Sequence, residues 1–298
     1  MTALNATALP AARVARPNVV RAVLRSKLGV VALAVLTLMV LVALLAPLIA
    51  PYDPGAQDLL VRLHPPAWAA GGDASHLLGT DQLGRDILSR LCYGARVSLL
   101  VGACAALLAG VVGAAIGLVA GFLGGWFDRI LMRIADIQLA FPAILLALAI
   151  VGFLGSGLWY VVLVLGFTGW VSYARVIRSE VLSLRTREFV TEARAIGVTD
   201  LTIMRRHLLP NVMAPLATIG TLHVAAAIVA EASLSYLGLG VPKQTVTWGG
   251  MLADGQLYLG TSWWVAVFPG VALMLTALAV NITGDVLRDV ADPKAYRS

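Results

Sequence analysis

The fold is decided by an uncharged run in the first half of the chain, VSLLVGACAALLAGVVGAAIGLVAG (Val97–Gly121). A helix needs about 20 apolar residues to cross the roughly 30 Å hydrocarbon core of a bilayer. The run meets that length, and it does not fit the short segments of alternating polarity that build a β-barrel. We therefore predict that these residues form a transmembrane helix.

Five further stretches are apolar enough to cross a membrane, so the sequence predicts an all-α, polytopic membrane protein with six transmembrane helices. The composition agrees, because 59% of the 298 residues are hydrophobic, only 13% are charged, and the mean hydropathy is +0.87. A typical soluble domain has roughly 25% charged residues, so a soluble enzyme, a disulfide-rich scaffold and a disordered chain are excluded. The five stretches are 28–50, 137–155, 158–174, 212–230 and 263–284.

The 22 lysine and arginine residues are distributed unevenly between the connections. If the N-terminus is cytoplasmic, 17 of them lie inside and 5 lie outside. Cytoplasmic loops carry the excess of positive charge in membrane proteins, so we predict that both termini are cytoplasmic. The cations do not form a basic stripe among stacking aromatic residues, and we therefore expect no nucleic-acid partner.

These assignments divide the chain into consecutive regions. We predict a cytoplasmic N-terminal tail, a first span, an external loop with an amphipathic helix, a five-helix transmembrane core and a cytoplasmic C-terminal tail. The core contains a cytoplasmic hairpin and an external loop that are too long to be simple turns. The regions are, in order, 1–27, 28–50, 51–96, 97–288 and 289–298, with the hairpin at 179–211 and the loop at 236–262.

The predicted external helix precedes the second span. Thr80 or Asp81 is a suitable N-cap, and Leu83, Ile87 and Leu91 follow at helical spacing on one face. Such a helix would either lie along the membrane or face the substrate from outside.

The connection at 179–211 has the most regular pattern of the loops. Phe189, Ala193 and Ile196 stand at positions i, i+4 and i+7, which places them on one face of a helix. Gly197 follows, and glycine supplies the positive φ at which helices commonly end. A generic loop would not need such order, whereas a docking element for a soluble partner would.

A second short helix follows that glycine. Thr199 or Asp200 begins it, with Asp200 placing negative charge in the first turn, where the helix dipole favours it. Pro210 is expected to end it. The connection is therefore predicted to be a helix–glycine–helix hairpin at the cytoplasmic face.

Glycine recurs every four residues along the second span, at 113, 117, 121 and 125. Small residues at this spacing leave a groove in which another helix can approach closely. We predict tight helix packing along that face.

Polar residues inside membrane spans are candidates for a transport pathway. We select Glu231, His223 and Asn281 on this basis. For Glu231, capping of the external turn at 233–240 is an equally good interpretation.

Two further acids are also candidates of this kind, although we expect them at the cytoplasmic interface instead. Asp136 and Asp285 lie three residues from Arg133 and Arg288, respectively, a spacing at which helical side chains can pair. We predict these two ion pairs.

The chain carries no recognisable catalytic motif. None of its three lysines follows a glycine, so it has no Walker-type phosphate loop, and its four histidines have no zinc-site spacing. We expect no enzyme activity, cofactor or metal in this chain. An intramembrane enzyme, a channel and a secondary transporter remain alternatives, although the internal repeat typical of many transporters is not found.

The hairpin carries residues through which the chain resembles the integral-membrane permease subunits of ATP-binding-cassette importers. The signature of these permeases is Glu-Ala-Ala, three residues, Gly, nine residues, Ile, one residue and Leu-Pro. The chain departs from it at Thr191, Glu192 and His207, although His207 fits the Arg-His-x-Leu-Pro-Asn pattern of the peptide branch. Positions that match are Ala193, Gly197, Leu209 and Pro210.

Other segments are similar to the C-type permease of the dipeptide, oligopeptide and nickel group, and the resemblance covers about residues 20–295. They are HLLGTDQLGRDILSR (76–90), GWFD (125–128), FP (141–142), EASLSYLG (231–238), WG (248–249), GDVLRD (284–289) and DP (292–293).

The resemblance implies a type I importer permease fold in the cytoplasmic (inner) membrane of a bacterial cell. It implies half of a translocation pathway for di- or oligopeptides, with nickel or glutathione as alternative substrates. The implied partners are a second, related permease subunit in a heterodimer, two ATPase subunits that bind ATP and magnesium, an external substrate-binding protein and the lipid bilayer. The residues implied to couple this chain to an ATPase are Glu188, Thr191, Glu192, Ala193, Gly197, Asp200, His207, Leu209 and Pro210.

Overall fold

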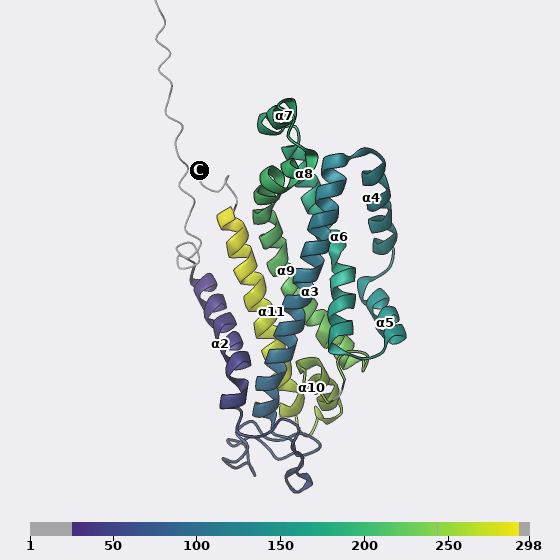
Figure 1. Ribbon diagram of the computed structural model, residues 1–298. Helices are drawn as coiled ribbons and strands as arrows, with labels where there is room; N and C mark the ends of the chain where they lie inside the picture. The colour runs from purple at the N-terminus through teal and green to yellow at the C-terminus, as the bar shows by residue number, and fades with distance from the viewer. Residues whose placement is uncertain (1–25, 243, 292–298) are drawn as a thin grey trace, which may run out of the picture.

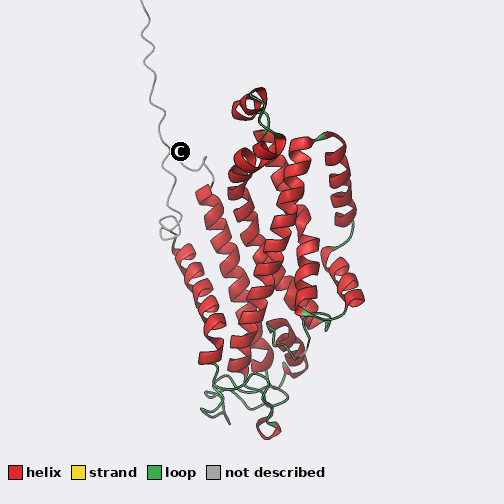
Figure 2. Ribbon diagram, viewed as in Figure 1, coloured by secondary structure: helices red, strands yellow, loops and turns green. Residues whose placement is uncertain are grey.

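The computed structural model describes residues 26–242 and 244–291, and it confirms the all-α prediction. Figure 2 shows helices joined by loops, and no strand occurs among the described residues. Most of both predicted tails lies outside the described residues. The helices are α2 (Lys27–Ile49), α3 (Ile87–Leu123), α4 (Gly125–Leu139), α5 (Ala143–Leu154), α6 (Leu158–Leu184), α7 (Glu188–Ala195), α8 (Asp200–Ile203), α9 (Leu209–Tyr236), α10 (Trp248–Gly255) and α11 (Trp264–Ala291).

The long helices form a bundle whose two ends differ. Figure 1 shows α7 and α8 at one end, and α10 with the 51–86 segment at the other. Five of the described helices are long and apolar enough to cross a membrane, and the crossings number six if α4 and α5 are counted as one span. The two ends therefore correspond to the two sides that the charge distribution distinguishes.

The third predicted span, 137–155, is not one straight helix. The chain bends by 88° between α4 and α5. The break falls at Phe141-Pro142, because proline lacks an N–H and disfavours helical geometry in the residue before it. The prediction of an unbroken helix there is wrong, and α4 begins earlier, at Gly125.

The packing of α3 against α6 explains three of the four repeated glycines. A Cβ atom at Gly113 would lie 2.5 Å from the Trp170 carbonyl oxygen, and one at Gly121 would lie 2.9 Å from that of Arg178. Gly117 is equally close to α6. The predicted close contact is confirmed at these three positions. At Gly125, which begins α4, an added Cβ atom would meet no described residue within 4 Å.

The predicted external amphipathic helix does not begin at Thr80 or Asp81. Asp81 accepts hydrogen bonds from the backbone N–H groups of Leu83 and Arg85, at 2.9 and 3.0 Å, and so holds a turn. The helix starts at residue 87, where Asp86 is the N-cap, and it continues without a break through the span. A separate helix lying along the membrane is therefore not present.

Pro210 does not end the second helix of the cytoplasmic hairpin. Residues 204–208 form a wide turn in which the Leu209 N–H bonds to the Met204 carbonyl, five residues back. The wider turn accommodates a proline ring that would clash with an ordinary helical carbonyl. As a result α8 leads directly into α9, and residues 200–236 form one long helix.

Candidate functional site

The reversal between α7 and α8 is centred on Gly197, whose φ of +81° confirms the predicted positive angle. The Gly197 N–H donates a hydrogen bond to the Arg194 carbonyl, and the Val198 N–H donates one to the Ala193 carbonyl, both at 3.0 Å. These bonds satisfy the end of α7 in the manner of a glycine C-cap. Thr199 then precedes the first turn of α8, as predicted.

The hairpin is anchored by one buried face. Val190, Ala193 and Ile203 are buried there, in a cluster that also includes Leu208 and residues of α3, α6 and α9. Ile196 does not belong to this face, because α7 ends at Ala195, and the side chain is 80% exposed. The predicted apolar face is therefore wrong at that position.

The outer surface of the hairpin is a mixture of charged and apolar side chains. Glu188, Thr191, Glu192 and Asp200 are exposed. Ile196 and Leu201, which are 80% and 61% exposed, stand among them at the tip. An exposed apolar pair rimmed by charges is typical of a surface that binds another protein.

Arg194 connects the hairpin to the membrane helices. Its guanidinium lies 4.6 Å from the centre of the Phe122 ring in the last turn of α3, and its Nε lies 3.7 Å from the Asp200 carboxylate. A cation placed over an aromatic face is attracted to the ring. The hairpin is therefore attached to α3 through Arg194 and to α9 through the continuous backbone.

The other predicted coupling residues lie at the base of the hairpin. The His207 ring is 6.3 Å from the Phe189 ring, and the His207 carbonyl accepts a 2.5 Å bond from Asn211 Nδ2. Leu209 is half-buried and Pro210 is exposed. These residues shape the wide turn and do not form the tip.

The three predicted pathway residues occupy different environments. Glu231 is fully buried and accepts hydrogen bonds from Ser98 Oγ at 3.1 Å and Ser235 Oγ at 2.7 Å, which joins α9 to α3. The ring of half-buried His223 packs 4.5 Å from that of Tyr173 on α6. Asn281 of α11 lines an open groove beside α9.

The two predicted ion pairs at the cytoplasmic interface are not formed. Asp136 instead contacts Arg175 of α6 at 2.6 Å, because α4 runs alongside α6. Within residues 26–242 and 244–291, no ion pair joins Asp285 to Arg288.

An ionic network at the opposite end was not predicted. Arg85 Nε lies 2.6 Å from Asp81, and Arg85 Nη2 lies 2.9 Å from Asp254 of α10. Arg90 lies 3.5 and 3.4 Å from the same two carboxylates. The Gly-Arg-Asp-Ile-Leu-Ser-Arg segment (84–90) contains both arginines of the network and could have indicated them. Nothing in the sequence points to Asp254. The network fastens α10 to the start of α3.

We expect that Asp254→Asn weakens this attachment. The side chain is 34% exposed, so solvent screening limits the expected loss of stability to about 1–2 kcal/mol. A thermal unfolding curve of the purified protein should show a melting temperature lower by a few degrees. Asp73→Asn is the control, because the Asp73 side chain is 59% exposed and its ion-pair contact with His64 is long, at 3.8 Å. Equal melting temperatures for the two variants would contradict the role of the network.

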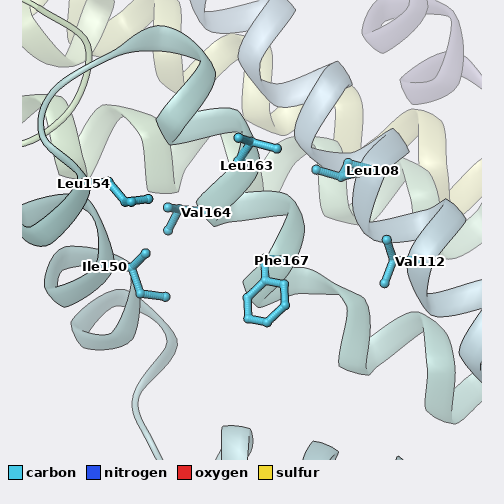
Figure 3. Close-up of a pocket in the computed structure, with 7 residues that line it drawn as sticks. All are labelled: Leu108, Val112, Ile150, Leu154, Leu163, Val164 and Phe167. Atoms are coloured by element: carbon cyan, nitrogen blue, oxygen red, sulfur yellow. The ribbon is translucent and has the colours of Figure 1, made fainter.

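A further cavity, of about 390 Å³, is lined only by apolar side chains of α3, α5 and α6 (Figure 3). It offers no polar partner for a peptide, a metal ion or a phosphate, so it can accommodate only apolar groups. The lining residues are Leu108, Val112, Ile150, Leu154, Leu163, Val164 and Phe167.

Comparison with known proteins identifies the family. Residues 113–296 match the family described as the binding-protein-dependent transport system inner membrane component. Residues 18–66 match the N-terminal transmembrane domain of oligopeptide transport permease C. Among solved structures, the MetNI methionine ABC transporter in inward-facing conformations is similar, with a TM-score of 0.53 over 67% of this chain and 96% of that chain. At 20% identity this likeness shows the fold alone.

Relatives with established names are considerably closer in sequence. The di/tripeptide transport system permease protein DppC of Pseudomonas aeruginosa is 45% identical over 257 residues, which cover 86% of this chain and 85% of the relative. The dipeptide transport system permease protein DppC of Escherichia coli is 44% identical over 270 residues, which cover 91% and 90%. The chain therefore belongs to the binding-protein-dependent transport system inner membrane components, as a C-type permease of the dipeptide and oligopeptide group of ABC importers.

Proposed function

We propose that this chain is the permease subunit through which an ATP-driven importer carries di- or oligopeptides, and that it forms half of the pathway. The observation that carries the proposal is the hairpin tip, where Ile196 and Leu201 are exposed among acidic residues. A separate ATPase subunit is the proposed occupant of this surface. The end that bears α7 and α8 is then cytoplasmic, and the end that bears α10 is external.

The proposed assembly has one more permease subunit, two ATPase subunits and an external substrate-binding protein. ATP and magnesium are bound by the ATPase subunits, which supply the free energy of transport. When they close, the hairpin moves with them. Arg194 and the continuous α8–α9 backbone carry this movement to α3 and α9, so that the pathway changes the side to which it opens.

Transport by the reconstituted complex tests this function. Proteoliposomes that contain the complex, ATP on the ATPase side and binding protein on the other side should accumulate labelled dialanine. The purified chain alone should hydrolyse no ATP. Labelled nickel and labelled glutathione are the competing substrates, and accumulation of either one in place of dialanine would contradict the peptide assignment.

A further inference from the structure

Two open grooves follow one face of α9 from end to end. They have volumes of about 410 and 460 Å³, and both include Leu222 near the middle of the helix. The groove nearer α10 is lined by α5, α9 and α11, and the groove nearer α7 by α6, α9 and α11. The two grooves share Leu222, and we refer to them together as the track along α9.

The wall of this track changes character along its length. Nearer α10 it is made of small or apolar side chains with two uncharged polar groups, Ser233 and Asn281. Nearer α7 it contains Glu180 of α6 and Arg288 of α11, the only charged side chains that line the track among the described residues, together with Thr218. A solute moving along α9 therefore meets a charged pair only at the end that bears the hairpin.

Neither charge of this pair is engaged elsewhere within the described part of the chain. Arg175 and Arg178, which are close to Glu180 on α6, are held by carboxylates of α4. No ion pair involves Glu180 or Arg288 among residues 26–242 and 244–291, and both side chains are exposed. One acid and one base thus remain available to a ligand.

The chemistry of this groove matches that of a short peptide. Every unblocked peptide has an ammonium and a carboxylate at its two ends, whatever its side chains, and opposite charges recognise them without regard to sequence. Val176, Pro215 and Leu222 supply apolar walls against which varied side chains can lie. Because the two charges are exposed, each contact is weak, which suits a site that must release its ligand.

We propose that Glu180 and Arg288 form an exit site that binds the two charged ends of the peptide before it leaves the pathway. This inference rests on the proposed peptide function. The ammonium contacts Glu180, the carboxylate contacts Arg288, and Thr218 Oγ1 lies in the same groove.

Thiol labelling from the cytoplasmic side tests the site directly, without the binding protein. In the assembled complex, with Cys92 and Cys104 replaced by alanine, the Thr218→Cys variant should react with a charged, water-soluble thiol reagent. Millimolar dialanine should slow the reaction, whereas N-acetyl-dialanine amide, which lacks both charges, should not. Adding Glu180→Gln should remove the protection. Leu107→Cys, at a 69% exposed position on α3 that we expect to face lipid, is the control and should not react.

Two labelling results would overturn the proposal. If Thr218→Cys does not react, lipid or the second permease covers the groove. If free and blocked dialanine protect equally, the charges do not recognise the peptide ends. Dialanine uptake by the wild-type complex separates these results from failure of the proposed function, because a complex that carries no peptide would contradict both.

Uptake kinetics provide an independent measurement. Glu180→Gln and Arg288→Gln should each lower the maximal dialanine uptake rate by about threefold to tenfold. The KM for loaded binding protein should not change, because delivery occurs at the other end. Asp289→Asn and Arg133→Gln are matched controls, since both residues are exposed and lie outside the track. If both groove variants take up dialanine at the wild-type rate, the exit site is contradicted, whereas the proposed peptide transport is not.

Discussion

Valine in place of Gly117 should prevent α3 from packing against α6 and leave little folded protein. A Cβ atom at Gly117 would lie 2.6 Å from the Ala174 carbonyl oxygen and 2.9 Å from the Ile177 Cβ. One of these neighbours is backbone, so the helices must separate, and overpacking of this kind typically costs about 1–3 kcal/mol or more. Because α3 and α6 form the most extensive helix pair, we expect the yield of monodisperse complex to fall by about tenfold.

Gly152→Val is the matched control for this variant. Gly152 also lies within a helix, α5, but a Cβ atom there meets nothing within 4 Å. The intrinsic cost of changing glycine to valine is therefore comparable, and only the contact differs. Size-exclusion chromatography of both variants after detergent extraction gives the comparison. An equal loss in the two would show that helix propensity or membrane insertion, and not packing, is responsible.

Hydropathy predicts the spans well because each apolar run must be removed from water as a unit. It does not predict how a helix responds to proline. Pro142 accompanies an 88° bend between α4 and α5, whereas Pro210 is accommodated by a wide turn within a continuous helix. The difference depends on whether the neighbouring backbone can form other hydrogen bonds, and a single sequence does not contain that information.

The candidate site shows the same division between local and distant effects. The positive φ of Gly197 follows from its own chemistry and its position after a helical pattern, so it is predictable. The partner of Asp136 is not, because Arg133 satisfies the helical spacing while Arg175 is brought alongside only by the packing of α4 on α6. Asp254 reaches Arg85 across 169 positions of sequence for a similar reason.

Gly197→Val should abolish peptide uptake while ATP hydrolysis by the assembled complex continues. The φ of +81° costs an ordinary L-residue about 1–2 kcal/mol, and a β-branched residue more. Valine is therefore expected to open the reversal and to displace Ile196 and Leu201 at the tip. We expect the uptake rate to fall by about tenfold or more, with hydrolysis no longer tied to transport. Paired measurements of dialanine uptake and phosphate release in proteoliposomes give the ratio of the two.

Gly197→Asn separates the backbone effect from any effect of added bulk. Asparagine adopts positive φ far more readily than valine, and a Cβ atom at Gly197 meets nothing within 4 Å in the described part of the chain. The asparagine variant should therefore transport within about threefold of wild type. If it fails as severely as valine, the proposed ATPase subunit packs directly on the glycine and bulk is what matters. If the valine variant transports normally, the shape of the reversal has no part in coupling, because the strain would then have been introduced without any loss of transport.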